Sequence, residues 1–270
     1  MLVSLTNSVP DIYLNMTIYI FANWKMNLTM RDSVSLAADV LDNSKFLNNK
    51  VCISIFPGTP SIFPVYEVIK GSGIHVGAQN VYAEVFGSFT GETSIPMIEE
   101  ACDYLLVGHS ERRRLFRETN ANINRKIAMA IEYGIQPVLC IGEGDESALS
   151  DRKVETELSN QITEALSELS PSEISQVLFA YEPLSAIGSG VPARPESVSK
   201  KAGFIKETVI NISDSKLRIE DLSVLYGGSV TVENAASYME LENVDGLLIG
   251  GASLKSDSFI KICHLAASTG

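Results

Sequence analysis

The sequence predicts an α/β fold, a single (β/α)8 barrel of eight parallel strands ringed by helices. Short apolar runs rich in β-branched residues recur along the chain, and longer stretches with helical periodicity separate them. This alternation is typical of βαβ units and a parallel sheet. A count of runs near eight, with no long linker or low-complexity segment, favours one closed barrel over an open sheet with a second domain. The 270 residues suffice to bury one such core.

The expected elements follow directly from this pattern. The expected strands are the apolar runs at 18–22, 51–56, 74–78, 104–107, 137–141, 177–181, 222–226 and 246–249. The expected helices are the periodic stretches at 33–41, 62–70, 120–133, 153–169, 196–212, 232–239 and 256–267. In a barrel of this kind, we expect the chemistry just after the strands, at their carboxyl ends.

Composition and charge narrow the function. The hydrophobic fraction of 45% and the charged fraction of 20% are typical of a water-soluble globular protein. The formal net charge of −12 argues against nucleic acid or an anionic membrane surface as a partner. An anionic substrate would therefore need local positive potential, supplied by a few side chains and backbone N–H groups. No apolar run approaches the roughly 18 residues that span a bilayer.

Cysteine usage and the first residues indicate the compartment. The four cysteines are widely spaced and form no CxxC pair, which favours reduced thiols in a cytoplasmic enzyme over a disulfide frame or a zinc site. Residues 1–16 lack a basic n-region and contain Pro10 and Asp11, so they make a poor signal peptide. We expect an N-terminal extension there, partly disordered, before one catalytic domain at 17–270, with Met16 as an alternative start.

The stretch from Gln176 to Gly190 is the clearest candidate for chemistry. Its apolar strand ends at a single carboxylate, Glu182, and Pro183 prevents a helix from starting there. A loop of small residues follows. An acid at the end of a buried strand, beside a loop that closes over it, is the arrangement expected of a general base in a loop-covered active site. The alternative is an ordinary connection in which Glu182 caps or solvates the turn.

A lysine follows the first strand, in the stretch FANWKMN. Lys25 is flanked by Trp24 and Met26, so packing would hold it in place. A fixed lysine at this position supplies positive charge for a phosphate or a developing oxyanion, with Asn23 beside it. An ordinary surface lysine is the alternative.

A histidine follows the fourth strand, and we separate it from the other two. His109 precedes an expected helix start, where the imidazole is pushed toward its neutral form and donates a hydrogen bond to a carbonyl oxygen. Glu111 lies two residues further on. We interpret His75 and His264 as structural or exposed, and Cys140 as a buried structural thiol.

The segment 77–94 and two glycine turns complete the candidates. The segment is long and rich in aromatic residues, which indicates a subunit contact; a loop folded back on its own core is the alternative. Gly227-Gly228-Ser229 and Gly250-Gly251 follow the last two strands and lead into helices. Backbone N–H groups in such turns approach an anion closely, and barrel enzymes commonly hold a phosphate there.

Taken together, the motifs resemble those of the triosephosphate isomerase family. The matching stretches occur in the family's order over residues 17–267: FANWKMN, VGAQN with GSFTGE, VGHSERR, CIGE, AYEP with AIGSG, YGGSV and DGLLIGGASL. The resemblance implies an intramolecular aldose–ketose isomerase that interconverts dihydroxyacetone phosphate and D-glyceraldehyde 3-phosphate through an enediolate, in glycolysis and gluconeogenesis. It implies no metal and no cofactor.

The resemblance also implies a role for individual residues. Glu182 would be the base beside the carbonyl carbon, and neutral His109 would polarise the carbonyl and pass protons between the two oxygens. Triosephosphate isomerase is itself a standard example of this pairing of a base with a neutral histidine, so these roles are carried over from the family. Lys25 would supply positive charge, supported by Asn23, and Glu111 would be a carboxylate near Lys25.

Further residues would bind phosphate or the neighbouring subunit. Gly188, Ser229, Gly250 and Gly251 would contact the phosphate through backbone N–H groups. Thr90 would sit at the tip of a loop inserted into the second subunit of a homodimer.

Two positions depart from the family pattern. Ser185 stands where the family usually has Trp, and Val191 where it has Lys or Arg. Both flank the closing loop, so we expect an active enzyme with slower or looser gating. Two alternatives stay open: a sibling isomerase of a four-carbon sugar phosphate, and a barrel used only for binding or assembly.

Overall fold

Eight parallel strands close into a barrel in the order of the sequence, and β8 pairs back onto β1. This computed structural model describes residues 17–45, 50–143, 151–186 and 191–269. The predicted (β/α)8 barrel is therefore confirmed. The predicted extension at 1–16 lies outside the described residues.

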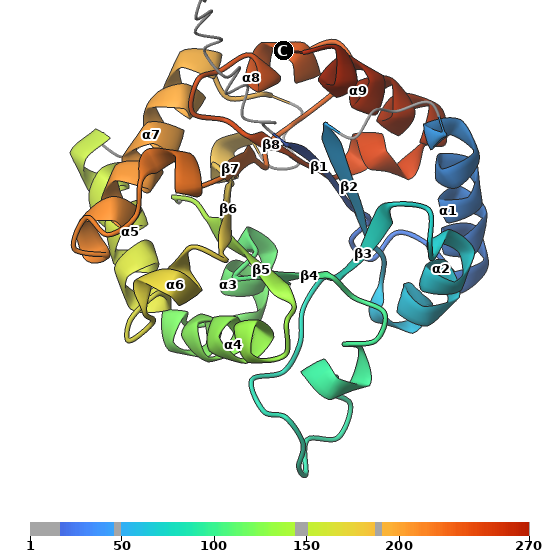
Figure 1. The fold of residues 1–270 in the computed structure, drawn as a ribbon, viewed down its shortest axis with the longest axis horizontal. Coiled ribbons are helices and arrows are strands. Elements are labelled where there is room, and N and C mark those ends of the chain that lie inside the picture. The colour runs from blue at the N-terminus through green and yellow to red at the C-terminus, as the bar shows by residue number, and fades with distance from the viewer. Residues whose placement is uncertain (1–16, 46–49, 144–150, 187–190, 270) are drawn as a thin grey trace, which may run out of the picture.

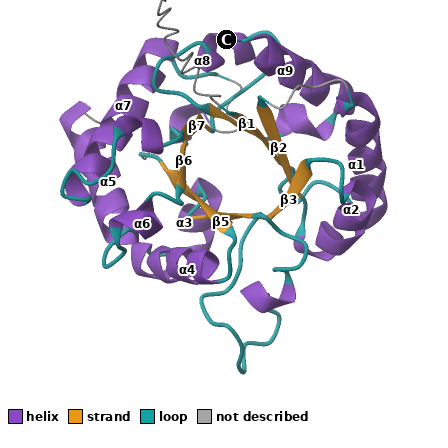
Figure 2. Cartoon of the chain, viewed as in Figure 1, coloured by secondary structure: helices purple, strands orange, loops and turns teal. Residues whose placement is uncertain are grey.

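The strands form an inner ring and the helices an outer one (Figure 2). The strands are β1 (Ile18–Asn23), β2 (Val51–Phe56), β3 (Ile74–Ala78), β4 (Tyr104–Val107), β5 (Gln136–Ile141), β6 (Leu178–Tyr181), β7 (Val224–Tyr226) and β8 (Gly246–Ile249). The helices are α1 (Met30–Ser44), α2 (Ile62–Ile69), α3 (Ser110–Phe116), α4 (Asn120–Glu132), α5 (Asp151–Ala165), α6 (Pro171–Ile174), α7 (Pro195–Ile212), α8 (Ala235–Met239) and α9 (Ser256–Ser268).

Alternation along the strands produces two separate apolar layers. Side chains such as Phe21, Phe56 and Leu225 fill the inside of the barrel. Their neighbours along the strands face outward and pack against the helices in a much larger cluster. Gly77 shows how tightly the inside is filled, because a Cβ at this position would lie 2.1 Å from the Phe56 ring. This packed core leaves the two mouths of the barrel as the places for polar groups.

The expected strands and helices are confirmed, with ends that agree to within four residues, and three differences have a visible cause. The strand expected at 222–226 begins only at Val224, because residues 219–221 form a 3-10 turn. The helix expected at 232–239 begins at Ala235, since the Asn234 side chain accepts from the Thr231 N–H and holds a turn there. The short helix α6 was not expected, although Ser170 and Glu173 form a capping box around it.

The segment between β3 and β4 projects from the barrel (Figure 1). Val81 is buried at its base, whereas Phe86 is 86% exposed. The Tyr82 and Phe89 rings pack together at a centroid distance of 4.6 Å. The base of the segment thus packs on the core, as the second expectation has it, and its outer part exposes apolar rings; the expected subunit contact stays a prediction. Within the described residues, no helix is long and apolar enough to cross a membrane.

Candidate active site

The carboxylate of Glu182 is placed by the end of β6. Its backbone N–H donates to the Ile141 carbonyl of β5 at 2.8 Å, which extends the ladder by one residue, and its side chain is buried, with the residue 1% exposed. Two neighbouring glycines make room for it. A Cβ at Gly142 would lie 1.9 Å from the Glu182 carbonyl oxygen, and one at Gly227 would lie 2.8 Å from Glu182 Cγ. Close backbone approach therefore fixes this side chain at the mouth.

Glu182 meets the β4–α3 turn across the mouth of the barrel. Its Oε1 lies 3.2 Å from Nε2 of His109, and its Oε2 accepts a hydrogen bond from the Ser110 N–H at 3.0 Å. Ser110 is the first residue of α3, so this amide is one of the free donors at a helix N-terminus. The structure thus brings together, at hydrogen-bond distance, the two residues that the sequence singled out on different strands.

The tautomer of His109 follows from its other nitrogen. The Glu111 N–H donates to His109 Nδ1 at 3.2 Å, so Nδ1 is an acceptor and carries no proton. The single ring proton of the neutral imidazole then sits on Nε2, the nitrogen that faces Glu182. His109 caps α3 in this way and presents an N–H donor to the cavity.

Lys25 is held in an unusual backbone conformation just beyond β1. Its φ is +52°, in the left-handed region, which costs a residue other than glycine of the order of 1–3 kcal/mol. Two hydrogen bonds support this conformation. The Lys25 N–H donates to Asn23 Oδ1 at 3.1 Å, and Gln79 Nε2 donates to the Lys25 carbonyl at 2.9 Å. Asn23 therefore fixes Lys25, as the sequence suggested, and Gln79 adds a support that the sequence did not suggest.

The Lys25 ammonium forms an ion pair with Glu111. The Nζ–Oε1 distance is 2.7 Å, and the two side chains are 28% and 37% exposed. Partial burial raises the pKa of the Glu111 carboxyl, but the hydrogen bond and the positive charge of Lys25 outweigh it and leave this pKa below its ordinary value. Glu111 therefore stays ionised and orients the lysine.

A cavity of about 510 Å³ joins these groups to the two glycine turns. Its lining includes Asn23, Lys25, His109 and Glu182, together with the predicted anion-binding residues Ser229, Gly250 and Gly251. Gly251 opens a 3-10 turn, so the second glycine turn lies at a helical start as expected. The first does not, because α8 begins only at Ala235.

The remaining predicted residues lie elsewhere or outside the described part. Gly188 falls among the residues that the structure does not describe. Thr90 is exposed in the projecting segment and is not among the residues that line the cavity. Cys140 is fully buried, and this burial raises the pKa of its thiol well above the ordinary value. The expectation of a structural thiol there agrees with its burial.

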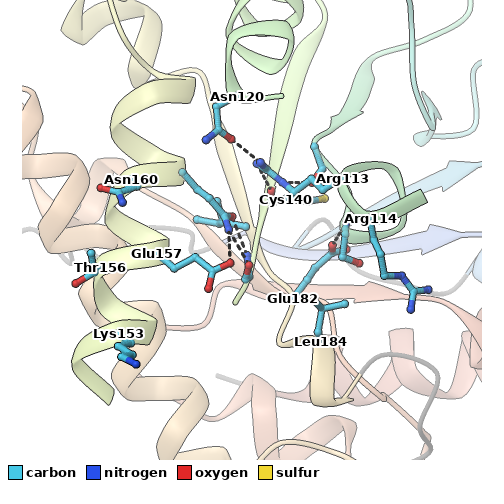
Figure 3. Close-up of a pocket in the computed structure, with 15 residues that line it drawn as sticks. Arg113, Arg114, Asn120, Cys140, Lys153, Thr156, Glu157, Asn160, Glu182 and Leu184 are labelled. Atoms are coloured by element: carbon cyan, nitrogen blue, oxygen red, sulfur yellow. Dashed lines mark hydrogen bonds between the residues drawn. The ribbon is translucent and has the colours of Figure 1, made fainter. Parts of the chain in front are cut away.

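A second cavity lies on the other side of Glu182, between β5 and α5 (Figure 3). Its volume is about 560 Å³. At its wall the Arg113 guanidinium donates to the Gly108 carbonyl at 2.7 Å, to Cys140 O at 3.2 Å and to Asn120 Oδ1 at 2.5 Å. Arg113 therefore ties the end of β4, and with it the turn that carries His109, to β5 and α4.

The sequence missed three contributors to this site. Arg113 anchors the turn that carries His109, Gln79 supports the backbone of Lys25, and Lys255 lines the cavity as a second cation. Position after a strand was the available signal for Gln79. Nothing in the local sequence distinguishes Arg113 from its neighbours.

Comparisons with known proteins show the family of this chain. A family model described as triosephosphate isomerase matches residues 18–266. The chain belongs to the triosephosphate isomerase family. Among its relatives, the triosephosphate isomerase of Dehalococcoides mccartyi strain 195 is 39% identical over 93% of this chain and 97% of that protein. That of Lawsonia intracellularis is 37% identical over 94% and 100%, and that of Aquifex aeolicus 38% over 91% and 98%.

Proposed function

We propose that this chain interconverts dihydroxyacetone phosphate and D-glyceraldehyde 3-phosphate, as an intramolecular aldose–ketose isomerase of its family. The observation that carries the proposal is the pairing of the Glu182 carboxylate with the Nε2 proton of His109, 3.2 Å apart, in a cavity that also holds Lys25. A base, a neutral hydrogen-bond donor and a cation are the groups that proton transfer next to a carbonyl requires. The substrate is a small phosphorylated sugar, and the reaction belongs to glycolysis and gluconeogenesis.

Glu182 acts as the base in this proposal. In the observed arrangement both carboxylate oxygens are engaged, one by the Ser110 N–H and the other by His109. Substrate must therefore displace the Glu182 carboxylate from these two donors before the carboxylate can remove the proton. Loss of the two hydrogen bonds makes the carboxylate a stronger base at that moment, because hydrogen bonds from such donors stabilise its charged form.

His109 acts on the oxygens of the substrate. Its Nε2–H donates to the carbonyl oxygen and strengthens that hydrogen bond as negative charge develops in the enediolate. Proton exchange between Nε2 and the two adjacent oxygens then carries the isomerisation to the other carbonyl. The Glu111 N–H on Nδ1 keeps the ring in the tautomer that this step needs.

Lys25 supplies positive charge at the substrate. A chain with a net charge of −12 needs such local positive charge to bind an anionic substrate. The Lys25 ammonium group is partly exposed toward the cavity, and its ion pair with Glu111 fixes its direction. Asn23 lines the same cavity and holds the backbone of Lys25. We assign phosphate binding to the N–H groups of Ser229, Gly250 and Gly251, with Gly188 as a further contact that lies outside the described residues.

We also propose that the chain forms a homodimer through the segment 77–94 and works in the cytoplasm. Phe86 and Phe89 expose apolar rings, with the residues 86% and 41% exposed, which is costly in water and typical of an interface. Thr90 lies beside them in the same projection. Sedimentation equilibrium of the parent and of Phe86→Ser tests the interface, and a parent that sediments as a monomer would contradict it.

The isomerase of a four-carbon sugar phosphate remains the second candidate, because the same base and electrophile would serve it. A barrel kept only for binding is disfavoured by the intact set of Lys25, His109 and Glu182. The deciding experiment is a coupled assay with D-glyceraldehyde 3-phosphate and, in parallel, with tetrose phosphates. Faster turnover of tetrose phosphate would replace the first proposal by the second.

The assay is run on the parent and on Glu182→Asp. Shortening the base by one methylene displaces its oxygens by about 1 Å, which is expected to lower kcat by about 10²-fold. Circular dichroism shows whether the variant is folded. If the folded parent has no activity on either substrate, the barrel used only for binding would be the remaining alternative. An unchanged kcat in Glu182→Asp would mean that another group is the base.

A further inference from the structure

The amino-terminal mouth of the barrel holds a cluster of side chains that the isomerase chemistry does not use. Cys52 and His75 are the second residues of β2 and β3, Tyr104 is the first residue of β4, and Asp103 directly precedes it. Amino ends of parallel strands meet at one mouth, so these groups lie at the opposite end of the barrel from Glu182.

The contacts within the cluster run from a carboxylate through an imidazole to a thiol. His75 Nδ1 lies 3.0 Å from Asp103 Oδ2, and the same imidazole interacts with the Cys52 thiol. Cys52 Sγ lies 3.3 Å from the Tyr104 hydroxyl. The His75 ring meets the Tyr104 ring edge-on, at a centroid distance of 5.5 Å, which places the imidazole and the sulfur beside one phenol.

The imidazole of this cluster is positively charged at neutral pH. The hydrogen bond to Asp103 and then the interaction with Cys52 raise the pKa of His75 to about 10. The neighbouring phenols of Tyr19 and Tyr104 stay neutral, since burial raises the pKa of both. A cation beside a sulfur atom stabilises the thiolate, which is the nucleophilic form of cysteine.

Access separates Cys52 from the other cysteines, all of which lie in the described part of the chain. Cys52 is half-buried, whereas Cys102, Cys140 and Cys263 are buried. Burial raises the pKa of all three of these thiols, that of Cys102 to about 12, so they are neutral as well as inaccessible. The cluster therefore contains the thiol of this chain that combines access with a cationic neighbour.

We propose that Cys52 is a modification site, a thiol that reacts with hydrogen peroxide to give a sulfenic acid, and that the pair of His75 and Asp103 activates it. The thiolate attacks one peroxide oxygen; an S–O bond forms as the O–O bond breaks. Sulfur is oxidised by two electrons and the peroxide is reduced. The departing hydroxide takes a proton from the His75 imidazolium and leaves as water. Atoms and charge balance in this step, because thiolate, imidazolium and peroxide give sulfenic acid, neutral imidazole and water. The proton that the thiol had released to water then returns to the imidazole.

The test measures the rate at which each cysteine is oxidised in the full-length protein. The protein is treated with hydrogen peroxide, sulfenic acid is trapped with dimedone, and the tagged peptides are counted by mass spectrometry over time. We expect Cys52 to carry the tag before the three buried cysteines. Cys52→Ser should abolish this fast phase and keep the isomerase activity of the parent, because residue 52 lies at the opposite mouth.

His75→Gln separates activation from mere exposure. Removing the cation should slow tagging of Cys52 by about tenfold or more, because the sulfur loses its positive neighbour and the departing hydroxide loses its proton donor. Asp103→Asn should slow it less, because the imidazole remains. His264→Gln is the matched control, as His264 is exposed and adjoins Cys263 in the sequence, and it should leave the rate unchanged.

Two outcomes would overturn the proposal. Tagging of Cys52 in folded His75→Gln at the parent's rate would show that the imidazole has no part in it. Tagging of Cys52 only after thermal unfolding, followed by circular dichroism, would show that peroxide does not reach the thiol in the native barrel.

Discussion

Each mouth of the barrel pairs a histidine with a carboxylate, and the two pairs differ in charge. At the carboxyl-terminal mouth His109 Nε2 lies 3.2 Å from Glu182 Oε1, with side chains 8% and 2% exposed. At the amino-terminal mouth His75 Nδ1 lies 3.0 Å from Asp103 Oδ2, with side chains 37% and 57% exposed. The nearly equal distances show that proximity to a carboxylate does not by itself decide the state of the imidazole.

The other partners of the two rings differ. The Glu111 N–H donates to Nδ1 of His109 at 3.2 Å, so Nδ1 is an acceptor, although the Glu111 carboxylate also lies 3.7 Å away. His75 interacts with Asp103 and with the Cys52 thiol, and both interactions raise its pKa. A backbone N–H that donates to the ring thus favours the neutral imidazole, whereas acceptors of its protons favour the imidazolium.

Matched substitutions at the two histidines should separate them most strongly. His109→Gln removes the donor that polarises the carbonyl, and we expect kcat to fall by about 10²- to 10⁴-fold. His75→Gln should leave kcat within about twofold of the parent, because it lies at the far mouth. Steady-state kinetics in both directions checks this. Comparable losses in two folded variants would mean that the mouths are coupled.

Removal of the cation at the active mouth should have the next largest effect. Lys25→Met keeps the length of the side chain and removes its charge, and we expect kcat/KM to fall by about 10²- to 10³-fold through lost stabilisation of the enediolate and phosphate. The pKa of Glu111 should also rise, because its main ionic partner is gone. Carboxyl titration by NMR measures the second effect; an unchanged Glu111 pKa would contradict the role of the ion pair.

Arg113 should matter to the turn that carries His109 more than its neighbour Arg114 does. Arg113→Met removes its hydrogen bonds and leaves the buried Gly108 and Cys140 carbonyls without this donor. We expect the free energy of unfolding to fall by about 2–4 kcal/mol. Arg114→Met, at an exposed position of the same helix, should change it by less than about 0.5 kcal/mol. Urea denaturation followed by fluorescence compares them, and equal losses would refute the special role of Arg113.

The pair at the amino-terminal mouth should give a pH signature of its own. The pKa of His75 is raised from 6.5 to about 10 on folding, so its contribution to stability is complete below pH 6.5 and disappears as pH rises through about 10. The difference in unfolding free energy between the parent and His75→Gln should therefore shrink across this window. Urea denaturation at several pH values measures it, and a difference independent of pH would contradict a charged His75.

The smallest effect is expected at the closing loop. Ser185→Trp restores the residue that the family usually carries, and we expect a change in kcat and in methylglyoxal leakage of less than about tenfold, since this position gates access without touching the reaction. Both quantities are measured on the same preparations. A parent indistinguishable from the variant would remove the idea that Ser185 loosens gating.

The sequence predicted the elements that local pattern controls. The buried run of β6, the carboxylate of Glu182 that follows it and the glycine turns could all be read without coordinates, because period and turn chemistry act over a few residues. The same reasoning failed at α8 and β7, where Asn234 and the 3-10 turn at 219–221 shorten the elements. It also passed over Arg113, whose partners lie on different elements.

Patterns and motifs in the sequence were enough to predict the barrel, the family and the side chains that stand at the ends of the strands. Tertiary contacts determine which of these side chains meet. Lys25 forms an ion pair with Glu111, 86 residues away in the sequence, and Ser110 and His109, which follow β4, contact Glu182, which follows β6. The tertiary structure also placed His75 beside Cys52, although the sequence suggested only a structural histidine. Propensity and hydrophobic periodicity act within a few residues, whereas hydrogen bonds between distant groups depend on barrel closure and strand register.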